Sequence, residues 1–357
     1  MKDQGANVSK QIVYIIGAGA SQAEASHKGG EPVSMMMKNS PIGDGVASRV
    51  IARSGINRDL DLIDEVDIEK LISLLAATGK KKYIQQAEAL RRAYFEELVE
   101  SLAKTGVLEN PELAITLLEF HKNVNYKKSE VLSGIINLNH DTLFQCASQE
   151  VHGCINIGFA FNSKFFSNGS GEKAPIIVQL HGSFNWTKAI PIRVLNLTAN
   201  SKYDTDILWI PPTTLKESKD YPYNKLMGLS YELLTKECDI LRIIGCSLSQ
   251  NDWNLISLIF NAQYFQYYSN NKRCFRIELI MDQKTGKNIE REYSYLKNLV
   301  PIGFLKDGDF SAYKEELISQ EMENPFKYWL KTKMQYHIKL DEISSDDLTD
   351  TMKKIIT

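Results

Sequence analysis

The chain has 357 residues, 42 basic and 44 acidic, with a formal net charge of −2. This length allows a large hydrophobic core, and the balanced charge argues against the whole molecule binding nucleic acid or an anionic membrane. Five scattered cysteines without C-x-x-C spacing argue against a structural zinc. Because we find no signal segment and no apolar run of about 18 residues, we expect a soluble cytoplasmic protein.

The first predicted element is a buried strand that leads directly into a glycine-rich turn, in the sequence IVYIIGAGAS of residues 12–21. An apolar run suits a strand covered on both faces, and glycines let the backbone turn tightly and approach a ligand. Amide groups at the start of the following segment can face an anion. We therefore expect the turn to bind a nucleotide phosphate or ribose through Gly17, Ala18, Gly19, Ala20 and Ser21.

This turn departs from the dinucleotide-binding fingerprint G-x-G-x-x-G. Gln22 stands where the third glycine would lie, and no second βα unit with a ribose-binding acid follows about 20 residues later. A tight turn after any buried strand is the alternative interpretation of the two glycines. The residues at the other strand ends are needed to distinguish a nucleotide-binding turn from an ordinary tight turn.

Further short apolar segments follow at intervals typical of a parallel sheet. With the first, they are residues 12–16, 134–139, 176–180, 207–210, 241–245, 276–280 and 302–305. We predict an α/β fold with a Rossmann-like parallel sheet in a domain of residues 1–305. A helical insertion is expected over about residues 56–130, with one helix starting at Asn110-Pro111. A C-terminal helical extension is expected over residues 306–357, whose aromatic residues either pack on the domain or dock a partner.

Polar residues follow three of these strands, where ligands bind in open α/β sheets. Asn139 and Asp141 follow the second strand, and His181 follows the third. Asn139 can hold a ribose hydroxyl and a water, His181 can act as a base, and Asp141 is either a ligand contact or a structural anchor. His140 points to the other side if the segment stays extended. After the fifth strand we expect a second nucleotide contact at Gly245, Cys246, Ser247 and Ser249.

This ordered set of motifs resembles that of the sirtuin superfamily. The resemblance rests on four short motifs between residues 12 and 305, which are GAGAS, Asn139-x-Asp141, His181 and Gly245-x-Ser247-Leu248. It implies an NAD pocket in which Asn139 holds the nicotinamide ribose and His181 is the base toward a ribose hydroxyl. The four-cysteine zinc module of the protein deacetylases is absent, and Pro32 is not followed by their Asp-Phe-Arg. Deacetylation is therefore not the expected activity, and no metal site is predicted.

The zinc-less pattern, with its insertion and a Gly245-x-Ser247-Leu248-x-x-x-Asp252 turn, resembles bacterial sirtuin-like NADases of anti-phage defence. This resemblance implies hydrolysis of NAD⁺, as substrate, to nicotinamide and ADP-ribose, without zinc or a prosthetic group. Control is expected through homo-oligomerisation or through a partner such as an ATPase, an Argonaute-type protein or a sensor subunit, with the insertion or the C-terminal helices as the contact surface. The alternatives are a non-catalytic NAD or ADP-ribose sensor, and a sirtuin-type ADP-ribosyltransferase or deacylase.

Overall fold

A computed structural model describes most of the N-terminal 281 residues and a short C-terminal segment. The described residues are 9–28, 46–56, 67–123, 130–158, 174–188, 193–194, 198, 200–210, 221–248, 252–269, 275–281, 326–327 and 329–330. Within them, five parallel strands form one sheet in the order β3-β2-β1-β7-β8. The strands are β1 (Lys10–Ile16), β2 (Glu130–Asn137), β3 (Ile176–Gln179), β7 (Ile240–Ile244) and β8 (Arg276–Ile280). The predicted α/β class with a parallel sheet is confirmed, and this strand order is compatible with a Rossmann-like fold.

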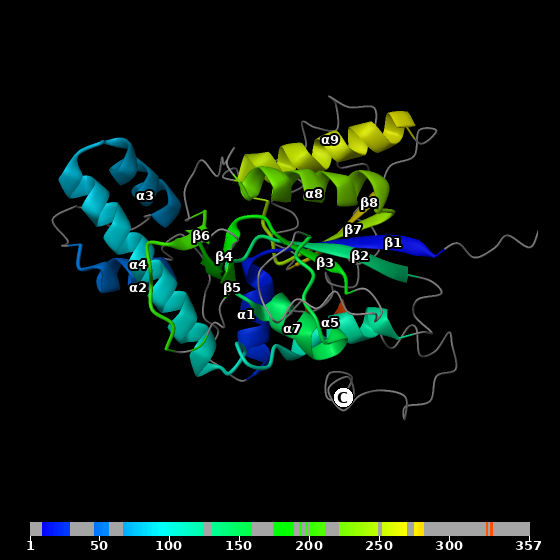
Figure 1. Cartoon of the computed structure of the whole chain (residues 1–357), viewed down its shortest axis with the longest axis horizontal. Helices are drawn as coiled ribbons and strands as arrows, with labels where there is room; N and C mark the ends of the chain where they lie inside the picture. Colours follow the sequence, from blue (N-terminus) through cyan, green and yellow to red (C-terminus); the bar gives the residue numbers. More distant parts are fainter. Residues whose placement is uncertain are drawn as a thin grey trace, which may run out of the picture.

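Helices cover both faces of this sheet (Figure 1). Helices α8 (Tyr223–Lys236) and α9 (Trp253–Ser269) lie on one face, and α1 (Ala18–His27), α5 (Glu112–Lys122) and α7 (Leu143–His152) lie on the other. In strand β1, the residues from Ile12 onward are apolar because the strand is covered on both faces. Val13 and Ile15 pack into the core under α8 and α9, whereas Ile12, Tyr14 and Ile16 pack into the opposite core.

A smaller antiparallel sheet follows β3 and corrects one prediction. It has the order β5-β4-β6, with β4 (Gly182–Thr187), β5 (Arg193–Val194) and β6 (Ile207–Trp209). Residues 207–210 were expected in the parallel sheet, and this is wrong because β6 pairs antiparallel with β4. A three-residue strand carries too short an apolar pattern to indicate its partner.

The small sheet supports the helical insertion. Helices α2 (Val46–Ser54), α3 (Ile68–Ala77) and α4 (Lys81–Lys104) share a core with Phe184 of β4 and Ile207 of β6. Helix α2 ends at Ser54, before the predicted insertion of residues 56–130, which contains α3 and α4. Helix α5 also falls within residues 56–130, but it packs on the parallel sheet. It begins at Glu112 with Pro111 in the N-cap position, one residue later than the sequence predicts. The segment therefore contains helices of two separate cores.

Little of the predicted C-terminal extension lies within the described residues. Phe326 and Trp329 are buried in the core that contains Tyr14, so for these two aromatic residues the packing interpretation is confirmed. The predicted strand at 302–305 lies outside the described residues, as does the rest of 306–357. Among the helices that are described, none combines the length and the apolar character that crossing a membrane requires.

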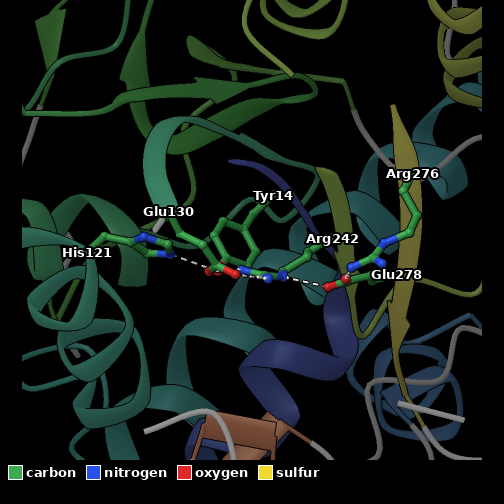
Figure 2. A network of polar contacts seen from close by, with 6 residues as sticks. All are labelled: Tyr14, His121, Glu130, Arg242, Arg276 and Glu278. Atoms are coloured by element: carbon green, nitrogen blue, oxygen red, sulfur yellow. Dashed lines mark hydrogen bonds and ion pairs between the residues drawn. The ribbon is translucent and has the colours of Figure 1, made fainter. Parts of the chain in front are cut away.

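A network of charged residues runs across three strands of the parallel sheet (Figure 2). Arg242 of β7 is fully buried and donates two 2.8 Å hydrogen bonds to the Glu130 carboxylate on β2. Its Nε atom donates to Glu278 of β8 at 2.8 Å, and Glu278 also pairs with Arg276. A buried guanidinium is tolerated only where partners of opposite charge surround it, and here two carboxylates do so.

Aromatic groups complete the surroundings of Arg242. Nη1 donates to the Tyr14 hydroxyl at 3.1 Å, and that hydroxyl lies 2.8 Å from His121 Nε2. The guanidinium carbon lies 5.4 Å from the centroid of the Trp329 ring, within the range of a cation–π contact. The contacts of Arg242 therefore connect four strands, β1, β2, β7 and β8, with α5 and the described C-terminal segment.

A buried carboxyl group on α1 gives the stability of the protein a predictable pH dependence. Glu24 Oε1 accepts a 2.6 Å hydrogen bond from the Ala114 amide, and burial raises the pKa of Glu24 to about 8. Because this pKa lies above its value in the unfolded chain, the free energy of unfolding is expected to fall as the pH rises from about 4.5 to about 8.

Glu24→Gln is therefore expected to stabilise the fold by up to about 3 kcal/mol at pH 7, because the amide keeps an acceptor and, unlike the carboxylate, does not have to take up a proton on folding. Thermal unfolding at pH 5, 7 and 8.5 measures the effect. The matched control is Glu112→Gln, since Lys28 and His27 lower the pKa of Glu112 and its loss should destabilise the protein slightly. Equal pH slopes for wild type and Glu24→Gln would contradict the prediction.

Candidate active site

The register of the parallel sheet brings the predicted site residues to one edge. Ile16 pairs with Asn137 on one side and with Ile244 on the other, and Asn137 pairs with Gln179. Four strands therefore end at the same level, and the segments that begin with Gly17, Leu138, Leu180 and Gly245 leave the sheet side by side. The predicted convergence of these strand ends is confirmed.

The two glycine-rich turns pack directly against each other. The Gly17 amide donates to the Ile244 carbonyl at 2.9 Å, and the Gly19 amide donates to the Gly245 carbonyl at 2.8 Å. A Cβ atom on Gly17 would lie 2.6 Å from the Gly245 oxygen, and one on Gly19 would lie 2.8 Å from the Gly245 Cα. The sequence suggests glycine here for the approach of a ligand, but in the structure the other turn occupies that space.

Gly245 is the most constrained position of this contact. Its φ of +60° favours glycine, and a Cβ there would lie 2.4 Å from the Ala20 nitrogen.

Gly245→Ala is expected to lower the free energy of unfolding by about 2–4 kcal/mol, from backbone strain and overpacking together. Denaturant unfolding measures the change. Gly228→Ala is the control: this α8 glycine has open space around its Cβ position, so alanine should be neutral or stabilise by up to about 1 kcal/mol. Equal effects of the two substitutions would contradict the packing role of Gly245.

The second turn places its residues in different environments. Cys246 is buried against Gly17, which makes it a packing residue, whereas Ser247 is exposed and its hydroxyl is accessible to a ligand. Leu248 is buried with a φ of +47°, the one positive φ of a non-glycine residue among the described residues. Strain of this kind is commonest at functional turns. Ser249 lies outside the described residues.

Asn139, Ser21 and Asp141 form one hydrogen-bonded group. Asn139 Nδ2 donates to the Gly17 carbonyl at 3.0 Å and to Ser21 Oγ at 2.9 Å. Ser21 Oγ in turn donates to Asp141 Oδ2 at 2.5 Å. With both hydrogens of the amide directed into the protein, Oδ1 is the atom of Asn139 that can accept from a ligand hydroxyl. Ser21 is buried in the first turn of α1 and orients Asn139, so its hydroxyl has a role that the sequence does not predict.

The contacts of Asp141 favour its role as a structural anchor. Oδ2 accepts from Ser21, and Oδ1 accepts from the Leu143 amide at 3.2 Å, at the start of α7. Burial raises the pKa of this carboxyl, and the two hydrogen bonds partly offset the rise. Both carboxylate oxygens therefore have partners within the protein, and Asp141 links the starts of α1 and α7.

The tautomer of His181 follows from one hydrogen bond. Its Nδ1 atom lies 3.1 Å from the carbonyl oxygen of Leu138, at the end of the neighbouring strand. Because a carbonyl only accepts, Nδ1 carries the proton in the neutral ring, and Nε2 carries the basic lone pair. The β6 strand holds the backbone as well, since the Ile210 amide donates to the His181 carbonyl at 2.7 Å. His181 is thus oriented as a general base would be.

An aromatic cluster lies beside His181 that the sequence does not predict. His140 stacks on Phe184, with ring centroids 5.3 Å apart, and meets the edge of Trp209 at 5.0 Å. Tyr94 of α4 stacks on Trp209 with an interplanar angle of 2°. The segment does not stay extended at His140, and the ring centroid of His140 lies only 6.2 Å from that of His181. No local sequence pattern connects a helix of the insertion with a strand-end histidine, so only the fold shows this neighbourhood.

Among the described residues, no three His, Cys, Asp or Glu side chains come together in a way that could hold a metal ion. The site instead offers an amide, an imidazole, an exposed hydroxyl and the first turn of α1. A scan of the chain against models of protein families finds no match, and a search of curated proteins finds no similar sequence.

Proposed function

We propose that the protein is a sirtuin-like NAD⁺ glycohydrolase that cleaves NAD⁺ to nicotinamide and ADP-ribose. The observation that carries this proposal is that Asn139 and His181 follow the adjacent strands β2 and β3, where the hydrogen bond to the Leu138 carbonyl leaves the basic nitrogen of His181 at Nε2. The ordered motifs that resemble those of sirtuins also support an NAD⁺ site at this edge of the sheet. Asn139 and His181 are the proposed catalytic residues.

The proposed reaction breaks the bond between C1′ of the ribose and the nicotinamide nitrogen. Nicotinamide leaves as a neutral molecule with the electron pair of that bond, and positive charge develops on the ribose ring as in glycoside hydrolysis. Water then attacks C1′, and its proton passes to His181 Nε2 and from there to solvent. The sum is NAD⁺ and water giving nicotinamide, ADP-ribose and a proton.

The other residues of the site would bind and orient the substrate. Asn139 Oδ1 would accept from a ribose hydroxyl, with Ser21 and Asp141 fixing its amide through their hydrogen bonds. Ala18 at the exposed start of α1, the positive end of this helix, together with Ser247, would contact the phosphates or the second ribose, whereas the Gly19 amide already donates to the Gly245 carbonyl. In this proposal Asn139 and Ser247 contact NAD⁺, whereas Ser21 and Asp141 orient Asn139.

The biological role we propose is that of a regulated cytoplasmic effector of anti-phage defence. An enzyme that depletes NAD⁺ is toxic when it is always active, so its activity would depend on homo-oligomerisation or on a partner protein such as an ATPase, an Argonaute-type protein or a sensor subunit. This role rests on the resemblance to sirtuin-like NADases and on the chemistry proposed above.

The fate of NAD⁺ labelled in its ADP-ribose part tests the proposed reaction. After incubation with the protein, hydrolysis predicts that the label appears as free ADP-ribose together with an equal amount of nicotinamide. Label attached to protein would indicate ADP-ribosyl transfer instead. Label that remains in intact, tightly bound NAD⁺ would indicate a sensor, and either of these two results would reject hydrolysis.

A further inference from the structure

Helix α9 has an outer face unlike that of an ordinary surface helix. It lies at the outer edge of the layer that covers the sheet beside α8 (Figure 1). Its sequence, WNLISLIFNAQYFQYYS, contains no charged residue. The inner face is buried in the sheet core through residues such as Leu255 and Ile259. On the outer face, Trp253 is 54% exposed, Tyr264 48%, Phe265 47% and Tyr268 62%.

These four aromatic residues lie on one side of the helix. At about 100° per residue, Trp253, Tyr264, Tyr268 and Phe265 fall at about 0°, 20°, 60° and 120° around the axis, so the side chains project within an arc of about 120° over the length of α9. Exposed faces of surface helices normally carry charges, whereas the centres of protein interfaces are rich in Trp, Tyr and Phe and poor in Lys and Glu. The composition of this face is that of an interface centre.

We propose that α9 pairs with α9 of a second copy of this chain, antiparallel across a two-fold axis. A face without charge meets its own copy without like-charge repulsion, whereas nucleic acid or an anionic membrane would require basic residues that α9 lacks. The antiparallel arrangement places Trp253 opposite Tyr268 of the partner subunit, so that aromatic rings meet at both ends. Two-fold dimers are also the commonest closed assemblies.

The exposed area is sufficient for such a contact. An aromatic side chain has a surface of about 150–250 Å², so four half-exposed rings present about 400 Å² in each copy. Two copies would bury about 800 Å² through these rings alone, and the polar residues between them bring the total to about 1,000 Å², where specific interfaces begin. The proposal does not depend on the NADase activity, because it rests only on the surface of α9.

The mass of the full-length protein in solution tests this interface. Wild type is expected to be a dimer or a multiple of one at about 10 µM, a concentration within reach of an interface of this size. The double variant Phe265→Lys, Tyr268→Lys should lose that dimer contact, because it removes two of the four aromatic rings and would bury two cations against a helix that has no carboxylate to pair with them. The matched control is Leu74→Lys on α3, which changes a residue that is 67% exposed and lies away from α9. A monomeric wild type, or a double variant with wild-type mass, would overturn the proposal.

A cross-link tests the arrangement without depending on the lysine variants. Asn261 is exposed near the middle of α9, so an antiparallel pair brings its two copies together, whereas Ser269 at the end of the helix is far from its own copy. On mild oxidation, Asn261→Cys is expected to form a disulfide-linked dimer in high yield, and Ser269→Cys is not. Equal yields for these two variants, or no cross-link above wild type, would reject the antiparallel interface.

Discussion

His181→Ala is expected to lower the rate of nicotinamide release from NAD⁺ by about 10²–10⁴-fold, the range that a general base contributes. The Nδ1 hydrogen bond to Leu138 orients the ring so that Nε2 can take the proton of the attacking water, and alanine offers no base. Because this interaction develops in the transition state, kcat should fall much more than the affinity for NAD⁺. Chromatographic assay of nicotinamide under saturating NAD⁺ measures kcat.

The matched control for this experiment is His152→Ala. His152 lies in the last turn of α7, at the opposite end of this helix from the carboxyl ends of the strands, and its loss should leave turnover within about 2-fold of wild type because it removes no group from the proposed site. Asn139→Ala should also abolish nicotinamide release, because it removes the proposed ribose contact. If His181→Ala and Asn139→Ala both keep wild-type turnover, the assignment of the catalytic residues is wrong.

Arg242→Met should lower the free energy of unfolding by about 3–5 kcal/mol, the usual cost of removing one partner of a buried ion pair. Glu130 and Glu278 would remain buried without the cation that neutralises both of them (Figure 2). Chemical denaturation followed by circular dichroism measures the loss. Methionine keeps much of the volume of arginine, so the expected effect is electrostatic rather than one of packing.

A second arginine provides the control for this prediction. Arg276 contacts the same Glu278 carboxylate, but its side chain is 42% exposed, and Arg276→Met should cost no more than about 1 kcal/mol. Adding Glu130→Gln and Glu278→Gln to Arg242→Met should restore part of the lost stability, because the unpaired charges are then removed. An Arg242→Met variant as stable as Arg276→Met would show that the buried network contributes little.

The parallel sheet and its strand ends could be predicted because its strands are short, mostly apolar runs followed by a turn. The run before Gly17 is of this kind, and so is the run before Gly245 apart from Arg242; both strands are where the sequence places them. The small antiparallel sheet could not be predicted in the same way. The pairing of Ile207 with Thr187 depends on the path of the chain between them, which the apolar pattern does not encode.

The individual site residues could be chosen from the sequence, but their contacts could not. That Asn139 and His181 follow adjacent strands is predictable, since parallel strands end at one edge of the sheet. That Ser21 donates to Asp141, or that Gly19 is packed on Gly245, depends on contacts between segments more than a hundred residues apart. Arg242 gives a partial signal, because a basic residue within a buried strand requires a partner of opposite charge, but the sequence does not identify Glu130 as that partner.

The most direct test of the proposed function is a time course of nicotinamide release by the assembly as isolated from its host, once its mass has been measured. We expect nicotinamide and ADP-ribose to appear in equal amounts and to exceed one equivalent per chain, because water regenerates the free enzyme in each cycle. Saturable binding of NAD⁺ that is recovered intact from this assembly would contradict the proposal that the site formed by Asn139 and His181 cleaves NAD⁺.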